Sequence, residues 1–280
     1  MEQTTVTKET LVTALRQLGI QEGDLCMVHS SMKSFGHLEG GPQAVVDAFE
    51  TVLGKEGTLA MPALIQKDFK NAYKAWHPDR PTDVGYLPEY FRKLPYVYRS
   101  NNATHSVTAR GRLAYELTWE HEAYGPHPLC MFGERTFCDS SPWMKMYELD
   151  CKTVFLGAKL TSNTVKHLVE MRLAEYYLNM VKNPMTAARL RSRLWSFHNY
   201  ETDTKAIWPF LTCDEEKLRS RLREQNALQE TECGNSHLMC VRVRDFYDSF
   251  LDALLTEPEA WLAPSAKNFL DWSRECLENS

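Results

Sequence analysis

The chain has 280 residues, of which 43% are hydrophobic and 25% are charged, and its formal net charge is −5. These values are typical of globular proteins and argue against the disordered and fibrous classes. No clustered basic face of the kind that binds nucleic acid stands out, and no apolar run approaches the roughly 20 residues of a membrane span.

The eight cysteines are scattered along the chain. They form no C-x-x-C pair and no paired metal spacing, so no metal site is predicted. Scattered cysteines are typical of a reducing compartment, and residues 1–8 are polar and lack the apolar core of a signal peptide. We therefore expect a cytoplasmic protein. No break in composition marks a boundary, so a single domain is expected over residues 1–280.

The first part of the chain predicts a helix, a strand, a second helix and a second strand. Apolar residues at helical spacing predict a helix between Thr7, which can cap it, and Gly19. Short apolar runs predict buried strands at residues 25–28 and 58–62. The run at 42–53, which follows two glycines, predicts the helix between them. This order is that of a parallel crossover.

The same patterns predict the remaining elements. Residues 66–82 and 99–111 show no clear period and are interpreted as polar loops. The stretch from 180 to 244 is interpreted as short strands and turns around one charged helix. A buried strand is predicted at 153–156, and helices are predicted at 86–92, 113–119, 164–177, 215–224, 245–255 and 265–277. The sequence therefore predicts an α/β protein.

A polar loop at residues 29–36 follows the first predicted strand. Ligands of open α/β sheets bind at the carboxyl ends of strands. Small hydroxyl residues and glycines expose backbone N–H groups, and the helix that begins after Gly41 adds a positive dipole end. This combination suits a phosphate. Two alternatives stay open: a plain loop with capping serines, and a nucleophilic Ser30 or Ser31, although no G-x-S-x-G elbow is present.

A second polar segment, at residues 163–170, contains an imidazole and a carboxylate three positions apart. His167 and Glu170 share one face of the predicted helix. Such a pair suits the removal of a proton from an amine that attacks a thioester. Asn163 and Thr164, at the helix start, could stabilise an oxyanion. The alternative is a surface or capping pair, and a metal site is disfavoured because no third ligand has a recognisable spacing.

A third polar segment runs from Arg99 to Ser106. It clusters hydrogen-bonding groups, and its alternative interpretation is a hydrogen-bonded surface loop.

Together these segments resemble the aminoglycoside 3-N-acetyltransferase family, which is distinct from the GNAT fold. The order and spacing of the matching motifs agree over roughly residues 1 to 260. The motifs are Val28-His29-Ser30-Ser31-Met32, Phe35-Gly36, Gly40-Gly41-Pro42, residues 54–62, residues 85–89, Phe91-Arg92, Arg99-Ser100, Ser106-Val107, Phe132-Gly133-Glu134, Ser141-Pro142, residues 154–157, and Asn163-Thr164 with His167 and Glu170.

The resemblance implies a three-layer α/β/α fold with a central mixed, largely parallel sheet. It implies direct transfer of an acetyl group from acetyl-CoA to an amine, with no metal. His167 is then the general base, Glu170 its partner or a ligand of the amine, and Asn163 and Thr164 complete the catalytic group. The residues expected to bind CoA are His29, Ser30, Ser31, Ser34, Phe35, Gly36, Arg99 and Ser106.

The chain departs from the family at one motif. Members usually carry His-Pro after Arg-Ser, whereas Asn102 and Ala103 occupy these positions here, and His105 lies three residues beyond the family histidine. The acceptor is therefore predicted as an aminoglycoside or another amino sugar. Acidic residues that could face a polycation are Asp68, Asp79, Asp83, Asp203, Asp214, Glu215 and Glu216.

Two other functions stay open at this point: a catalytically silent CoA-binding protein, and a serine hydrolase. The expected partners are CoA and a small-molecule amine, with neither nucleic acid nor a membrane. Whether the chain forms a homo-oligomer is left open by the sequence.

Overall fold

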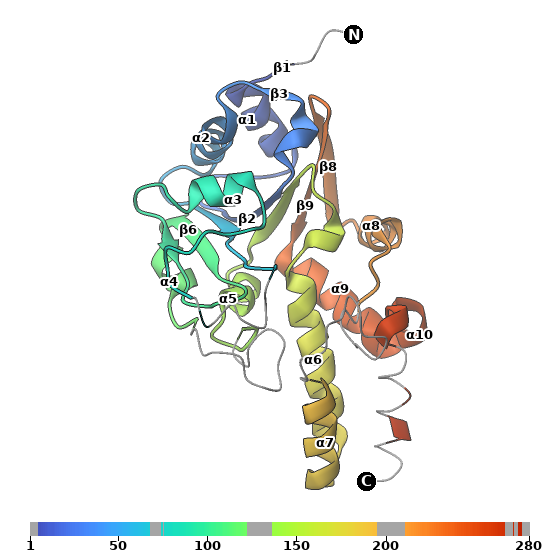
Figure 1. Cartoon of the computed structure of the whole chain (residues 1–280). Coiled ribbons are helices and arrows are strands. Elements are labelled where there is room, and N and C mark those ends of the chain that lie inside the picture. The colour runs from blue at the N-terminus through green and yellow to red at the C-terminus, as the bar shows by residue number, and fades with distance from the viewer. Residues whose placement is uncertain are drawn as a thin grey trace.

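The computed structural model describes residues 5–67, 74, 76–121, 136–194, 211–266, 271 and 274–275. A seven-stranded sheet forms the centre of this part of the chain (Figure 1). Its strands are β2 (Leu25–Ser30), β4 (Thr58–Pro62), β5 (Tyr98–Arg99), β6 (Val107–Gly111), β7 (Lys152–Leu156), β8 (Leu228–Cys233) and β9 (Ser236–Arg242). Two short strands, β1 (Thr5–Val6) and β3 (His37–Leu38), pair separately.

Helices and 3-10 turns connect these strands. The α-helices are α1 (Lys8–Gln17), α2 (Gly41–Leu53), α3 (Tyr86–Phe91), α4 (Ala114–Thr118), α5 (Pro142–Glu148), α6 (Val165–Met180), α7 (Pro184–Leu194), α8 (Glu215–Glu224), α9 (Val243–Thr256) and α10 (Pro258–Trp261). The 3-10 turns are η1 (Met32–Phe35), η3 (Leu160–Ser162) and η4 (Pro264–Ala266). In the part of the chain that the structure describes, no helix is both long and apolar enough to cross a membrane.

The sheet is mixed, but the prediction that it is largely parallel was wrong. Its strand order is β5-β6-β4-β2-β7-β9-β8. Only β2 pairs in parallel, with β4 and β7, and the other four pairings are antiparallel. The predicted crossover from β2 through α2 to β4 is present and gives one of the parallel pairs. The antiparallel pairs come from β5 and β6, in a segment interpreted as a loop, and from the β8–β9 hairpin.

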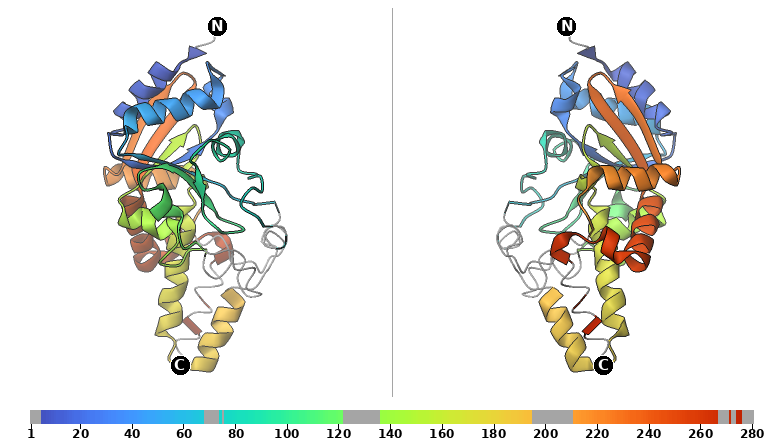
Figure 2. Two further views of the ribbon diagram at one scale, coloured as in Figure 1. Left: turned by 90° about the vertical axis from the view of Figure 1, so that its left-hand side faces the viewer. Right: turned by 90° about the vertical axis from the view of Figure 1, so that its right-hand side faces the viewer.

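Both faces of the sheet are packed against helices. Successive residues of a strand point to opposite faces, and in β2 Leu25 and Met27 belong to one apolar cluster while Cys26 and Val28 belong to another. Helices α1, α2 and α3 contribute to the second cluster, and α4, α5, α6 and α9 contribute to the first. Helices accordingly flank the sheet in both views of Figure 2.

Most predicted helices are present close to their expected bounds. Thr7 caps α1 with a reciprocal capping box, as its position before the apolar run predicted. Helices α5, α7 and α10 were not predicted, and residues 184–194 of α7 were interpreted as strands and turns. Most of the helix predicted at 265–277 lies outside the described residues, as do Phe132, Gly133 and Glu134.

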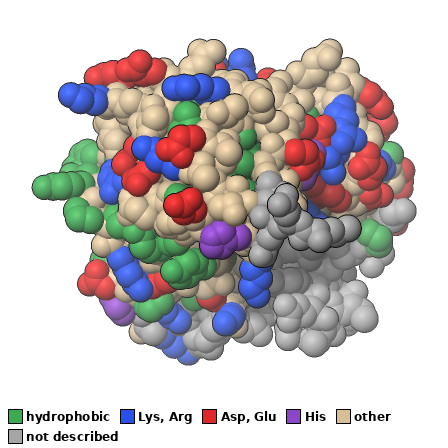
Figure 3. Space-filling model, turned by 90° about the horizontal axis from the view of Figure 1, so that it is seen from above, with side chains coloured by type: hydrophobic (Ala, Val, Ile, Leu, Met, Phe, Trp, Pro, Cys, Tyr) green, Lys and Arg blue, Asp and Glu red, His purple; other side chains and the backbone are tan. Residues whose placement is uncertain are grey.

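Charges of both signs share the face seen from above. On the described residues of this face, Lys and Arg side chains lie among Asp and Glu side chains (Figure 3). The ion pairs of the described residues include those of Arg219 and Arg223 with Glu230. The face in view therefore has a mixed potential rather than the one-sign field that binds polyanions.

Candidate active site

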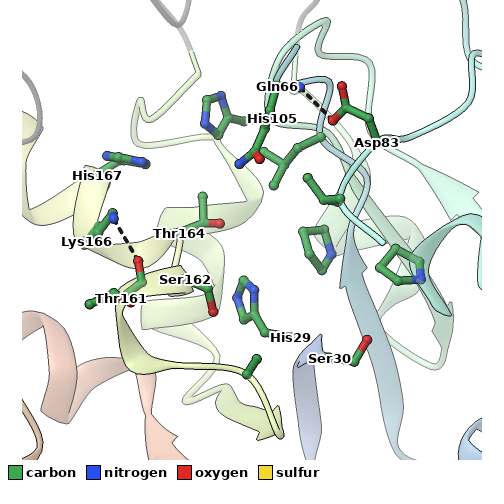
Figure 4. Close-up of a pocket in the computed structure, with 15 residues that line it drawn as sticks. His29, Ser30, Gln66, Asp83, His105, Thr161, Ser162, Thr164, Lys166 and His167 are labelled. Atoms are coloured by element: carbon green, nitrogen blue, oxygen red, sulfur yellow. Dashed lines mark hydrogen bonds between the residues drawn. The ribbon is translucent and has the colours of Figure 1, made fainter. Parts of the chain in front are cut away.

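A cavity of about 390 Å³ opens at the carboxyl ends of the three strands that run in parallel. His29 and Ser30 end β2, Pro62 ends β4, and Ala158 follows β7. The first turn of α6 and the segments after β4 complete its wall (Figure 4). Its other lining residues are Leu64, Gln66, Asp83, Val84, Pro88, His105, Thr161, Ser162, Thr164, Lys166 and His167.

The predicted pair on α6 faces this cavity. The Nδ1 of His167 lies 2.6 Å from Oε2 of Glu170, and Glu170 is fully buried. The other carboxylate oxygen, Oε1, accepts a hydrogen bond of 2.9 Å from the backbone N–H of Leu211. A carboxylate oxygen accepts, so the hydrogen of this bond lies on Nδ1 of His167. The bond orients the imidazole of His167, which lines the cavity.

The start of α6 holds this pair in place. The Oδ1 of Asn163 accepts from the backbone N–H of Val165 at 3.1 Å, and the carbonyl of Thr164 accepts from the N–H of His167 at 3.0 Å. Thr164 lines the cavity, whereas Asn163 is fully buried behind it. Within the described residues, the Nδ2 of Asn163 has no hydrogen-bond partner. Of the two predicted oxyanion donors, Thr164 is therefore the one at the cavity surface.

Two polar atoms at the end of β2 are buried without partners among the described residues. They are Nε2 of His29 and Oγ of Ser30, and both residues line the cavity. The His29 ring stacks on Phe155, with centroids 5.4 Å apart. Burial, and to a lesser degree the charge of Lys166, lowers the pKa of His29 to about 4. His29 is therefore a neutral imidazole near pH 7, and both atoms can bond to a ligand that enters the cavity.

The remaining residues of the first loop shape the backbone beside the cavity. The carbonyl of Ser31 accepts from both the N–H and the hydroxyl of Ser34, at 2.9 and 2.7 Å. The Ser34 hydroxyl also lies 2.7 Å from that of Ser236. Phe35 is buried in the core, and Gly36 has a φ of +74°. Ser31, Ser34, Phe35 and Gly36 are not among the described residues that line the cavity, so their contact with CoA stays a prediction.

Arg99 and Ser106 support the wall of the cavity from behind. The Arg99 guanidinium donates to the Ser106 hydroxyl at 3.0 Å and to the carbonyls of Ala63 and Pro78 at 2.8 and 2.9 Å. It also lies over the Trp76 ring. These bonds fix the backbone that leaves β4 toward the cavity. Neither residue is among the described lining residues, and their predicted contact with CoA stays a prediction.

His105 is a cavity residue that sequence reasoning missed. It is 2% exposed, and its ring lies edge-on to that of His167 with centroids 5.8 Å apart. Phe137 contacts both rings. Burial, followed by the charge of His167, holds the pKa of His105 well below its usual range. The only signal in the sequence was its place in the polar segment after Arg99.

Among the described residues, Asp83 is the one acidic candidate that lines the cavity. Its two oxygens accept from the backbone N–H groups of Gln66 and Lys67. Glu215 instead holds the turn before α6, by accepting from the N–H groups of Leu160 and Thr161. Asp79, Asp214 and Glu216 are not among the described lining residues. Asp68 and Asp203 lie outside the described residues.

Comparisons with known proteins give one consistent result. The aminoglycoside 3-N-acetyltransferase family model matches residues 27–255. The chain is 28% identical over 258 residues to aminoglycoside N(3)-acetyltransferase IV from Salmonella sp, covering 92% of this chain and 90% of that protein.

Two solved structures have a similar fold. AAC-IIIb in a binary complex with CoASH has a TM-score of 0.69 and 21% identity, covering 93% of this chain and 99% of that chain. A mutant of aminoglycoside acetyltransferase AAC(3)-IVa in complex with apramycin has a TM-score of 0.64 and 23% identity, covering 92% of this chain and 96% of that chain.

Proposed function

Since the chain belongs to the aminoglycoside 3-N-acetyltransferase family, a family of acyltransferases, we propose that it transfers an acetyl group from acetyl-CoA to an amine. The acceptor is an aminoglycoside or another amino-sugar-like molecule. The relatives support both substrates, because one similar fold is known with CoASH and another with apramycin.

The observation that carries this proposal is the buried His167–Glu170 pair at the cavity. In the proposed step, Nε2 of His167 removes a proton from the attacking amine as its nitrogen bonds to the thioester carbon. The carbon–sulfur bond then breaks, and the CoA thiolate leaves. Glu170, held by Leu211, fixes the tautomer and orientation of the imidazole. The proton on His167 can afterwards pass to the thiolate.

The donor side of the site is proposed from the end of β2 and the loop that follows it. Oγ of Ser30 faces the cavity without a hydrogen bond among the described residues. It fits a polar group of a pantetheine arm, with Ser31, Ser34, Phe35 and Gly36 shaping the path of that arm. Thr164, backed by Asn163, is proposed to stabilise the thioester oxygen as negative charge develops on it. Arg99 and Ser106 complete the proposed donor site, because their hydrogen bonds fix the backbone that forms the wall of the cavity.

The test is release of free CoA thiol from acetyl-CoA with a panel of amines. The panel contains aminoglycosides, simple hexosamines and nucleotide-linked amino sugars. A thiol-reactive dye reports the product, and a no-acceptor control is needed because Cys213 is an exposed free thiol. Release that depends on the acceptor, with the acetylated amine found by mass spectrometry, is the expected result.

Two other results would contradict the proposed acetyl transfer and would each indicate a different function. Equal release with and without an amine would indicate a hydrolase. Binding of acetyl-CoA with no release for any acceptor would indicate a silent CoA-binding protein.

A further inference from the structure

We propose that the cavity binds an anionic group of the acceptor between Lys166, the amino end of α6 and His29. The acceptor class is then an amino sugar that carries a phosphate or carboxylate as well as its amine. This inference rests on the proposed function and narrows its substrate.

The position of Lys166 is the first observation. It lies in the first turn of α6, a helix of 16 residues, directly before His167. Its Nζ donates to the carbonyl of Thr161 at 2.8 Å, which uses one of the three N–H donors of an ammonium group. The amino end of a helix carries partial positive charge and disfavours a cation. An anion in the cavity would be attracted by both charges and would offset their repulsion.

His29 is the second, independent observation. It is 6% exposed, lines the same cavity, and has an Nε2 without a partner among the described residues. Lys166 is close enough that its charge contributes to the lowered pKa of His29. In the tautomer that carries its hydrogen on Nε2, the imidazole and the ammonium group of Lys166 can each donate to an oxygen of a phosphate or carboxylate.

The anion belongs to the acceptor rather than to CoA because of its distance from the reacting atoms. Lys166 neighbours the proposed base, and the thioester must reach that base for transfer to occur. The pantetheine arm, with its two amide groups, separates the thioester sulfur of CoA from the nearest phosphate. With the thioester at His167, the phosphates of CoA lie well beyond this part of the cavity.

The opposite side of the cavity has the opposite charge. Asp83 and Gln66 lie across from Lys166 and Thr161 in Figure 4. Among the described lining residues, Lys166 carries the only ammonium group and Asp83 the only carboxylate. The cavity is therefore polarised, and it suits an acceptor that carries both positive and negative groups better than one with positive groups alone.

The test compares two acceptors that differ by one phosphate, glucosamine and glucosamine 6-phosphate. The wild-type protein should use the phosphate ester with a higher kcat/KM, by about 10- to 100-fold, the usual effect of hydrogen bonds to a charged group. Lys166→Met should abolish this preference, mainly through the KM of the phosphate ester. Lys182→Met removes an exposed ammonium beyond the end of the same helix and should keep the preference.

Three kinetic results would overturn the inference. The first is a wild-type protein that uses both acceptors equally. The second is a Lys166→Met variant whose KM rises for acetyl-CoA instead, which would assign the lysine to the donor. The third is an equal fall in kcat with both acceptors, which would assign it to the reacting atoms. Lys166→Gln repeats the test if the methionine variant fails to fold.

Failure of the proposed function gives a different signature. In that case neither acceptor releases CoA thiol, and binding is measured directly by calorimetry. Binding of glucosamine 6-phosphate that weakens at least tenfold in Lys166→Met would still support the anion site. Equal binding of the ester by both proteins, or no binding by either, would overturn it.

Discussion

His167 is the residue on which the proposed chemistry depends most directly. Its Nδ1 bonds to Glu170, and we propose that Nε2 is the nitrogen that meets the amine of the acceptor. His167→Ala should lower kcat by about 10²–10⁴, the usual contribution of a general base. The KM for acetyl-CoA should change little, because Ser30 and the loop that follows it remain. Steady-state kinetics with the best acceptor checks this, and a variant with near wild-type turnover would show that His167 is not the base.

Among the described residues, Glu170 accepts two hydrogen bonds that a glutamine cannot both replace. If the amide oxygen of Glu170→Gln keeps the bond from Leu211, its NH₂ group faces Nδ1 of His167 and forces the proton onto Nε2. Turnover should then fall by about 10²–10⁴. If the amide is reversed, the NH₂ group meets the N–H of Leu211, and the free energy of unfolding should fall by about 1–3 kcal/mol.

Kinetics and urea unfolding of the same Glu170→Gln preparation separate these two effects. Glu175→Gln is the matched control, since Glu175 lies on the same helix with a partly exposed side chain. Unchanged turnover together with unchanged stability would contradict the role assigned to Glu170.

At this scale the sequence identified the pair but not its surroundings. The three-residue spacing of His167 and Glu170 on a helix is visible in the chain itself. The approach of His105 to His167 is not, because it depends on how the segment after β5 packs against α6. Leu211 was equally invisible, since a backbone N–H is the same in every residue and only the fold shows which one meets Glu170.

The end of β7 packs tightly against the loop that follows β2. Gly157 has a φ of +64°, and a Cβ there would lie 1.9 Å from Oγ of Ser34 and 2.7 Å from Oγ of Ser236. Gly157→Ala should therefore displace the loop and lower the free energy of unfolding by about 2–4 kcal/mol, from overpacking and positive φ together. The KM for acetyl-CoA should rise if this loop shapes the donor path.

Gly19→Ala provides the control for Gly157→Ala. Gly19 also has a positive φ, of +79°, but a Cβ there would have no atom within 4 Å. The Gly19→Ala variant should lose only the free energy that a positive φ costs an alanine, about 1 kcal/mol. Equal losses in the two variants would show that the contact with Ser34 is unimportant.

Buried elements were predicted well, and polar strands were not. The apolar runs of β2, β4 and β7 are buried on both faces and read as continuous hydrophobic stretches, so their sequence alone was sufficient. Strand β8, with the sequence LQETEC, is partly exposed at the sheet edge. Its residues become a strand only by pairing with β9, which is a tertiary effect that local pattern cannot reveal.

For the whole molecule, we propose that residues 1–280 form one domain, because the central strand β2 contributes to both apolar clusters. The stability of this domain should depend on pH through its buried histidines. Burial lowers the pKa of His29 to about 4, and burial, opposed in part by a bond to the Thr136 carbonyl, lowers that of His121 to about 3.

Unfolded histidines gain a proton near pH 6.5, whereas these two do so only at much lower pH in the folded state. Acidification below pH 6.5 therefore favours the unfolded chain. The free energy of unfolding should fall by about 2 kcal/mol per histidine between pH 7 and pH 5. Urea unfolding at a series of pH values measures this slope, and His29→Asn should make it shallower.

The carboxylate of Glu230 does not account for the fall in the free energy of unfolding between pH 7 and pH 5. Hydrogen bonds from Arg223, opposed by partial burial, lower the pKa of Glu230 to about 2. Its stabilising contribution is therefore lost only as the pH falls below about 4.5. A free energy of unfolding that stays constant from pH 7 to pH 5 would contradict the assignment to histidines.

The bond between Glu170 and the backbone of Leu211 also affects when activity can appear during protein synthesis. A nascent chain that has left the ribosome only as far as α7 contains both His167 and Glu170, but it lacks the Leu211 amide that bonds to the buried carboxylate. It also lacks β9, the neighbour of β7 in the sheet. The orientation of His167 should therefore be fixed only after the last third of the chain has emerged. We expect truncated translation products to be inactive even though they contain both proposed catalytic residues.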